Sequence, residues 1–188
     1  MAVESQAEAK PSGKFAIFRA ASAPNFEEVD VMTYAGALSP PLQDAYFKAM
    51  EAGMGDGQTV KLLFSAPGFS LSYAWFKSGF PLPRHRHDVD CLYYVIAGSL
   101  ILGAETLGAG DGFFVPSDMA YSYVPGPEGV EVLEFRHAEH FTIEFLAGNP
   151  AFWAKALETV RAQRDSWQHQ PRPQDPATTA GNGGNERS

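Results

Sequence analysis

The stretch Gly79–Gly98, GFPLPRHRHDVDCLYYVIAG, decides how the rest of the chain is interpreted. Residues two apart on a β-strand point to the same face of a sheet, so His85 and His87 present both imidazole rings on one side. Cys91 follows four residues later, on a second strand-like run that ends at Gly98. Two imidazoles and a third donor from a neighbouring strand are typical of an incomplete metal coordination shell. The pattern predicts a metal site formed by His85, His87 and Cys91.

This stretch resembles the first motif of the cupin family, which runs glycine, five residues, His-x-His, three or four residues, an acid, six residues and glycine. Cys91 departs from the motif, because it stands where the family usually has a glutamate ligand. The positions that match are Gly79, His85, His87 and Gly98.

The second cupin motif is recognisable at residues 110–121, where Gly110 and Pro116 match the family's spacing. Asp118 replaces a glycine, and Tyr121 occupies the position of a histidine ligand. Half of the four usual ligands are therefore substituted. The resemblance covers about residues 70 to 137 and implies an all-β, jelly-roll β-barrel, but it names no substrate.

Composition indicates a soluble globular protein. A chain of 188 residues with 45% hydrophobic content is large enough to bury one substantial core. The formal net charge of -8 argues against nucleic acid or an anionic membrane as a general partner. One cysteine excludes an internal disulfide framework, and neither a secretory start nor an apolar run of 18 residues is present. We expect a cytoplasmic protein with a small-molecule substrate.

Short strand-like runs separated by glycine and proline dominate the chain. Their close spacing favours an antiparallel sandwich or jelly roll over alternating strands and helices, in agreement with the cupin resemblance. The expected strands are 15–18, 59–64, 70–77, 91–96, 99–103, 112–116, 120–124, 130–137 and 140–145.

Two helices are expected at the edges of this β-rich region. Ser39 before two prolines predicts a helix at about 40–52, and Asn149 before Pro150 predicts another at 150–168. We expect the second helix to pack against the barrel through one apolar face. The two ends of the chain are expected to be disordered. The apolar face consists of Trp153, Leu157, Val160 and Trp167. The predicted organisation is a disordered segment 1–13, a single cupin domain 14–168 and a disordered tail 169–188.

Cys91 and Tyr121 each allow two interpretations. As a thiolate ligand, Cys91 would favour zinc, copper or iron over harder ions; otherwise it is a small buried hydrophobic residue. A phenol binds metal well only after losing a proton with an ordinary pKa of about 10, so Tyr121 fits better as a catalytic or substrate-binding hydroxyl in the pocket. We expect His137 and His140 to be surface residues.

The leading hypothesis is a metal-dependent cupin enzyme, an oxygenase or dioxygenase that acts on a small, partly apolar molecule. One divalent transition-metal ion is expected, with iron first and zinc, copper, manganese or nickel as alternatives. The alternative functions are a non-catalytic binding or sensing cupin and a metal-dependent isomerase or lyase. Phe15, Ile17 and Phe18 would be poorly covered in a monomer, so we expect a homodimer. The predicted pocket residues are Tyr73, Trp75, Tyr93 and Tyr123.

Overall fold

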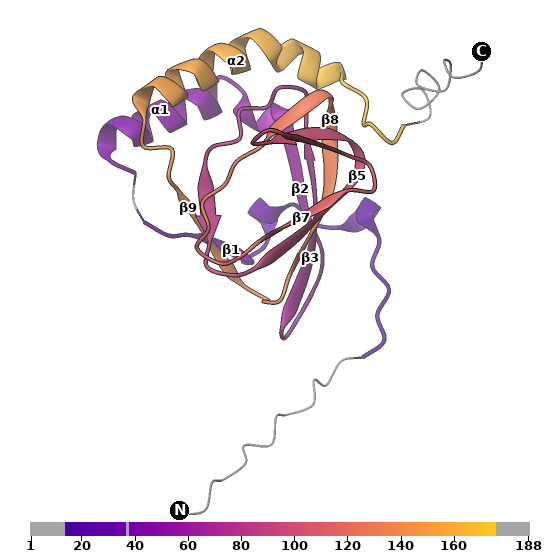
Figure 1. The fold of residues 1–188 in the computed structure, drawn as a ribbon. Helices are drawn as coiled ribbons and strands as arrows, with labels where there is room; N and C mark the ends of the chain where they lie inside the picture. The colour runs from indigo at the N-terminus through magenta and orange to yellow at the C-terminus, as the bar shows by residue number, and fades with distance from the viewer. Residues whose placement is uncertain (1–13, 37, 176–188) are drawn as a thin grey trace, which may run out of the picture.

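The computed structural model describes residues 14–36 and 38–175. Figure 1 shows strands wrapped around a common interior, with two α-helices along one end. The chain forms short 3-10 helices (η), α-helices (α) and strands (β). In chain order these are η1 Ala20–Ser22, η2 Phe26–Glu28, β1 Met32–Tyr34, α1 Pro40–Glu51, η3 Met54–Gly57, β2 Gln58–Ala66, β3 Phe69–Phe76, β4 His85–His87, β5 Cys91–Leu102, β6 Glu105–Gly108, β7 Gly112–Val115, β8 Val124–Arg136, β9 Phe141–Phe145 and α2 Pro150–His169.

The strands form two sheets. The larger has six strands, in the order β2-β3-β8-β5-β6, with β7 paired to β5 outside this path. The smaller has the order β1-β9-β4, and in it β1 runs parallel to β9 while β4 runs antiparallel to it. This arrangement confirms the prediction of a β-rich fold with two α-helices.

Alternation along the strands sorts side chains between the interior and the outer face. On β5, Cys91, Tyr93 and Val95 are buried, whereas the intervening Leu92 and Tyr94 are exposed. A strand places successive side chains on opposite faces, so this pattern aims one set of residues at the space between the sheets. The same alternation on β3 and β8 supplies the rest of the interior.

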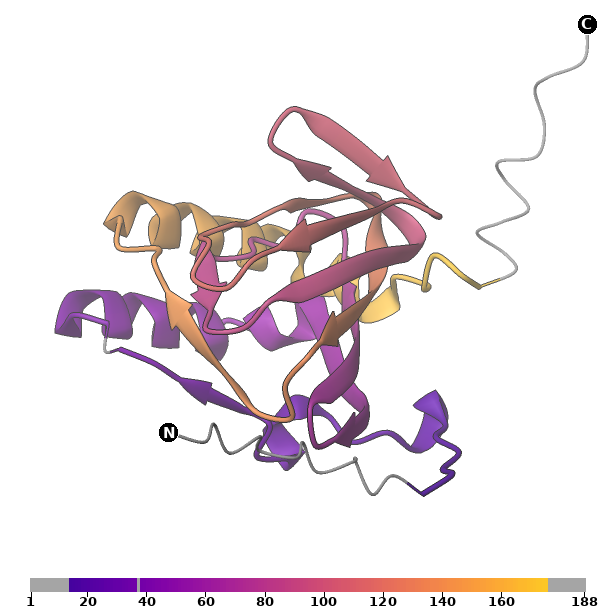
Figure 2. The ribbon, with the colours of Figure 1, turned by 60° about the horizontal axis from the view of Figure 1, so that its bottom comes forward.

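The helix α2 begins as its sequence predicts. The Asn149 side chain accepts a hydrogen bond from the Ala151 amide at 2.9 Å, and Pro150 occupies the first helical turn. The indole nitrogens of Trp153 and Trp167 donate to the carbonyls of Ala147 and Ser78, at 2.8 and 2.9 Å. The two helices lie side by side (Figure 2). The predicted apolar face is confirmed, with Ala156 buried in it and Leu157 only partly buried.

Four expected strands differ from the structure. Residues 15–18 form no strand and their apolar side chains are exposed, since no described neighbour pairs with them. Segment 120–124 contributes an isolated bridge at Tyr121. The separate strands at 91–96 and 99–103 are one strand, β5. Gly98 does not end it because a register shift absorbs the glycine, whose φ is 71° and whose missing Cβ would lie 2.1 Å from the Gly129 carbonyl oxygen.

The chain beyond α2 packs against the larger sheet as far as it is described. Gln170 accepts from the Ser78 amide and donates to the Glu128 carbonyl, and the Gln174 amide donates to Glu131 at 3.0 Å. This corrects the predicted start of disorder at residue 169, because these polar contacts offset the low apolar content of the segment. Predicted disorder at 1–13 and 176–188 lies outside the described residues. No described helix is long and apolar enough to cross a membrane.

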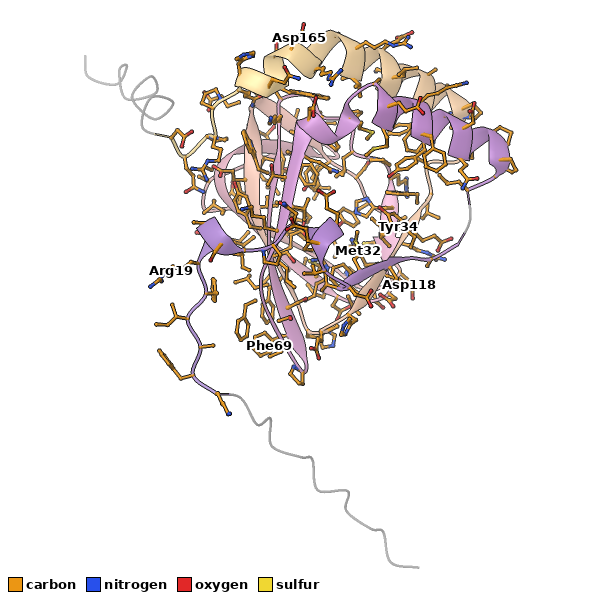
Figure 3. All side chains as sticks on the ribbon, turned by 180° about the vertical axis from the view of Figure 1, so that it is seen from behind. Arg19, Met32, Tyr34, Phe69, Asp118 and Asp165 are labelled. Atoms are coloured by element: carbon orange, nitrogen blue, oxygen red, sulfur yellow. The ribbon has the colours of Figure 1, made fainter. Side chains whose placement is uncertain are left out.

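Figure 3 relates the two ends of the molecule. Phe69 lies at the turn between β2 and β3, far from Asp165 on α2. Met32 and Tyr34, on β1, lie between these extremes, beside the interior space. The interior is therefore bounded by helices at one end, and β1 contributes to its wall.

Candidate functional site

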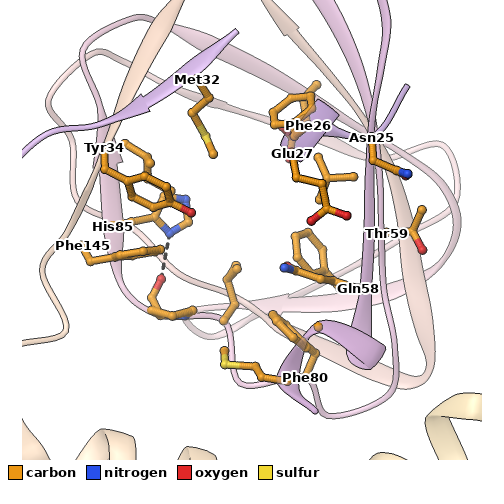
Figure 4. Close-up of a pocket in the computed structure, with 18 of the residues that line it drawn as sticks. Asn25, Phe26, Glu27, Met32, Tyr34, Gln58, Thr59, Phe80, His85 and Phe145 are labelled. Carbon is orange, nitrogen blue, oxygen red and sulfur yellow. Dashed lines mark hydrogen bonds between the residues drawn. The ribbon is translucent and has the colours of Figure 1, made fainter. Parts of the chain in front are cut away.

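A cavity of about 720 Å³ lies between the two sheets. Figure 4 shows Tyr34, His85 and Phe145 on one side of it, facing Asn25, Gln58 and Thr59 across the space. A volume of this size suits a small organic molecule. Titratable and aromatic residues among those lining it are Phe26, Glu27, Tyr34, Tyr46, Asp56, Phe76, Phe80, His85, His87, Tyr121, Tyr123, Glu134, Arg136 and Phe145.

The two histidines of β4 are held in the same way. The Nδ1 atom of His85 lies 2.8 Å from the Pro83 carbonyl oxygen, and Nδ1 of His87 lies 2.8 Å from the Thr142 carbonyl oxygen. A carbonyl only accepts, so each Nδ1 carries the proton and each Nε2 is an acceptor. The ring centroids are 5.1 Å apart. The sequence therefore correctly predicted two imidazoles that share one face.

Tyr121 meets His85 across a backbone bridge. The two residues exchange amide-to-carbonyl hydrogen bonds of 2.9 and 3.0 Å, and the Tyr121 hydroxyl lies 2.9 Å from His85 Nε2. Since Nε2 accepts, the Tyr121 hydroxyl donates, and its oxygen is left to accept from the Tyr93 hydroxyl. Arg136 Nη2 lies 3.5 Å from the Tyr93 oxygen. The donors thus point in one direction, from Arg136 through Tyr93 and Tyr121 to His85.

Arg136 is a buried cation at the cavity wall, with its side chain 2% exposed. Its Nη2 donates to Glu134 at 2.8 Å, and its guanidinium carbon lies 4.1 Å from the centroid of the Phe141 ring. Both β8 residues face inward. They form a buried ion pair beside the two imidazoles.

The two sequence motifs lie next to each other in the structure. His85 and His87 lie side by side on β4, and Tyr121 faces His85 from the second motif, between the two sheets. The arrangement resembles a cupin fold. Solved structures that match it include an RmlC-like cupin from Shewanella frigidimarina, at 26% identity, 44% of this chain, 77% of that chain and a TM-score of 0.40.

Two further solved structures match the chain at lower sequence identity. KdgF from Halomonas is 23% identical over 43% of this chain and 79% of that chain, with a TM-score of 0.38. The polyketide cyclase RemF from Streptomyces resistomycificus is 20% identical over 56% of this chain and 82% of that chain, with a TM-score of 0.46. No family model and no curated protein matches the chain. The activity must therefore be inferred from the site itself.

Burial determines the protonation of the histidine and tyrosine side chains in the candidate site. It lowers the pKa of His85 and lowers that of His87 to about 3, with the Arg136 charge adding to the effect at His87. Burial also raises the pKa of Tyr93 and Tyr121 well above the ordinary value. Burial disfavours the charged form of Arg136, but the Glu134 carboxylate outweighs this and raises the guanidinium pKa. At neutral pH the imidazoles and phenols are uncharged.

Cys91 does not complete a metal shell with the histidines. Burial raises its thiol pKa to about 12, it is absent from the cavity lining, and its neighbour across β8 is the cationic Arg136. Among residues 14–36 and 38–175, no three His, Cys, Asp or Glu side chains are grouped to hold one metal ion. The two imidazoles suit a metal, but the predicted set of His85, His87 and Cys91 does not fit one.

The predicted pocket residues divide between two faces of the larger sheet. Tyr123 lines the cavity, and Tyr93 lies behind Tyr121, stacked on Phe113 with ring centroids 4.5 Å apart. Tyr73 and Trp75 belong to the face opposite Ala74 and Phe76 and are not cavity residues. The prediction assigned the wrong parity to β3, because the inward face of that strand carries mostly small residues and the larger aromatic side chains lie on the opposite face.

Glu134 and Arg136 are site residues that sequence reasoning left undecided between the inside and the outside. Their parity along β8 is that of Val130 and Val132, both fully buried. That parity is the signal that could have placed the ion pair inside. His137 and His140 are exposed, as expected for surface histidines.

Proposed function

We propose that this cupin-fold chain is an enzyme that binds a small, partly apolar organic molecule between its sheets and catalyses proton transfer on it. The observation that carries the proposal is the pair of neutral imidazoles beside the Tyr121 hydroxyl, each oriented by a backbone carbonyl. Oriented acid and base groups that line a cavity are typical of general acid–base sites.

His87 is the base in this proposal. Within the described residues its Nε2 atom has no hydrogen-bond partner, whereas Nε2 of His85 is occupied by Tyr121. His87 would take a proton from a carbon next to a carbonyl group. The electron pair of the broken C–H bond then moves to the carbonyl oxygen. Tyr121 stabilises this oxygen by turning its one hydroxyl hydrogen from His85 Nε2 toward it. This reaction class covers isomerisation and lyase chemistry.

Phenylpyruvate is a suitable test compound, because it is partly apolar and carries exchangeable protons next to a carbonyl. We expect the protein to accelerate exchange of these protons with deuterium in D₂O, followed by proton NMR. His87→Gln and Tyr121→Phe should each reduce the enzymatic rate by about 10²-fold or more. His140→Gln, at an exposed position, is the matched control and should leave the rate unchanged.

Binding without exchange would favour a non-catalytic binding cupin over an enzyme. Binding is measured separately, from shifts of amide resonances as phenylpyruvate is added. If phenylpyruvate binds and the exchange rate equals that of buffer, the proton-transfer proposal is wrong. If His87→Gln retains the full rate, the base has been assigned to the wrong residue.

A metal-dependent oxygenase is the second candidate function. The observation in its favour is that both histidines offer Nε2 as an acceptor after Nδ1 is fixed by a carbonyl, a common arrangement in metal sites. The test is the metal content of protein purified without chelator, compared with His85→Ala/His87→Ala. Stoichiometric iron or another transition metal that is lost in the double variant would favour this candidate.

We also propose that two copies of the chain form a homodimer through the outer face of the larger sheet. Exposed apolar residues gather there, among them Leu92, Phe114 and Phe135. The cross-strand register places Leu92 directly between the other two. A face of this kind favours association, since a monomer exposes it to water.

A further inference from the structure

Unpartnered polar atoms are concentrated at one place in the interior. In the described part of the chain, five buried side-chain nitrogen or oxygen atoms have no hydrogen-bond partner. Four of them belong to three residues, as Ser70 Oγ, Ser72 Oγ, and Nε and Nη1 of Arg136. Buried polar groups are nearly always paired, so a cluster of exceptions indicates a missing partner.

The sheet register brings these residues together. Ser70 is the cross-strand partner of Arg136, and Ser72 is the partner of Glu134 on the same pair of strands, β3 and β8. Both serines are fully buried, on the inward face of β3. Arg136 and Glu134 also line the cavity between the sheets. The unpartnered nitrogens thus belong to a residue of the cavity wall, Arg136, and the two serines are the cross-strand neighbours of this ion pair behind the lining.

The donors outnumber the acceptors in this cluster. A guanidinium has five N–H groups and no acceptor, and each serine hydroxyl can donate once. Only Nη2 of Arg136 is engaged, by Glu134 and Tyr93, so the three N–H groups on Nε and Nη1 lack an acceptor. Glu134 thus occupies one part of the guanidinium and leaves the rest for another oxygen group.

We propose that Arg136, Ser70 and Ser72 bind a carboxylate of the ligand. A carboxylate is acceptor-only and offers about four lone-pair positions, which matches a set of unpaired donors on a cation and two hydroxyls. An amide or alcohol in the same place brings donors of its own and no charge. This inference rests on the proposed function, because it assumes a ligand in the cavity, and it specifies an organic acid as the substrate class.

Benzoate and benzamide provide a matched pair of probes, similar in shape and different in charge. Side-chain Nε–H resonances of the arginines are recorded by NMR, and that of Arg136 is assigned from its loss in Arg136→Lys. We expect benzoate to shift this resonance and to bind at least tenfold more tightly than benzamide. Removing two hydroxyl donors in Ser70→Ala/Ser72→Ala should weaken benzoate binding severalfold and leave benzamide binding unchanged.

Glu134→Gln/Arg136→Met removes the cation without leaving a buried, unpaired carboxylate. In this variant the benzoate preference should fall below twofold, while Arg86→Met, outside the cavity, should keep it. Equal binding of both probes to the native protein overturns the carboxylate site but leaves cavity binding intact. Binding of neither probe overturns the proposed function as well. A preference that persists in the double variant shows that Arg136 is not the anion-binding group.

Discussion

Tyr121 shows how much a single residue can contribute at this site. Its hydroxyl joins Tyr93 to His85, so the imidazole, two phenols and the guanidinium form one continuous series. In the cupin motif this position usually belongs to a metal-binding histidine, and here a hydrogen bond to His85 Nε2 stands in its place. The bond and a metal ion would compete for the same nitrogen lone pair.

Replacing Tyr121 by phenylalanine should destabilise the protein. The change leaves His85 Nε2 without its donor and the Tyr93 hydroxyl without its acceptor, in a buried setting. We expect the free energy of unfolding to fall by about 1–3 kcal/mol in urea titrations. Tyr94→Phe, at an exposed position on β5, is the control and should change stability by less than about 0.5 kcal/mol. Equal effects of the two changes would contradict the hydrogen-bonded series.

His87 should make the protein sensitive to acid. Burial lowers its pKa to about 3 from an ordinary value of 6.5, so between these values the unfolded chain takes up a proton that the folded chain does not. Stability contributed by the neutral imidazole is complete above pH 6.5 and falls by up to about 1.4 kcal/mol per pH unit below it. Urea titrations from pH 7 to pH 4 should show a shallower decline in His87→Gln than in the native protein, and His140→Gln should retain the native slope.

Cys91 should be chemically inert in the folded protein. It is 1% exposed and its thiol pKa is raised to about 12, and only the thiolate reacts quickly with disulfide reagents. We expect no reaction with Ellman's reagent at pH 8 until urea unfolds the chain, when one thiol per chain reacts. Rapid labelling of native protein would return Cys91 to the list of possible metal ligands.

At the scale of elements, the chain beyond α2 packs on the larger sheet through hydrogen bonds. Gln170 bridges Ser78 and Glu128, and the Gln174 amide donates to Glu131, a fully buried carboxylate that also accepts from Tyr73. These contacts connect α2 to β3 and β8. The segment's stability depends on specific hydrogen bonds and very little on its own apolar content.

Truncation should reveal these bonds. A chain ending at Gln168 loses the hydrogen bond from the Gln174 amide to Glu131 and the one from the Ser78 amide to Gln170. We expect its free energy of unfolding to fall by about 1–3 kcal/mol. A chain ending at Asp175 retains all of these contacts and should melt close to the full-length temperature. Equal melting temperatures of the two truncated chains would show that residues 169–175 contribute nothing to stability.

The same elements show what sequence could and could not predict. Glycine spacing, the His-x-His pair and the Asn149-Pro150 start of α2 are local signals, and the structure follows them. The inward pair Glu134 and Arg136 is different, because burying two charges depends on partners from β3 and β5 that only the folded sheet supplies. Tyr73 and Trp75 were misplaced for a related reason, because the larger aromatic side chains of β3 lie on the face opposite the interior.

At the scale of the whole molecule, one face of the larger sheet is an apolar row. Five strands contribute to it in register, and Phe69 adds a ring stacked near Phe135. At a strand spacing of about 4.8 Å the row is roughly 20 Å wide, enough to contribute to a stable interface. Phe18 touches its edge through Phe64, with ring centroids 5.9 Å apart. The row is Phe64, Leu71, Phe135, Leu92 and Phe114.

Light scattering tests the proposed homodimer directly. We expect a mass near twice 20.4 kDa for the native protein, and a mass near 20.4 kDa for Leu92→Lys/Phe135→Lys, because a charge in the row disfavours burial. Met119→Lys, exposed in a loop outside the row, should remain dimeric. A native mass of 20.4 kDa would exclude the dimer.

The burial of Trp153 and Trp167 on α2 gives the protein an optical reporter of its own. Two of the three tryptophans are buried on the inward face of this helix, at 1% and 0% exposure, and Trp153 packs edge-on against Tyr46 of α1. The Trp167 ring also lies 6.0 Å from Phe80, which lines the cavity. The tryptophan emission of the native protein should therefore have its maximum at short wavelength. A red shift of this maximum would report that α2 has separated from the rest of the molecule. Comparing it with circular dichroism shows whether α2 separates before the β structure is lost or together with it.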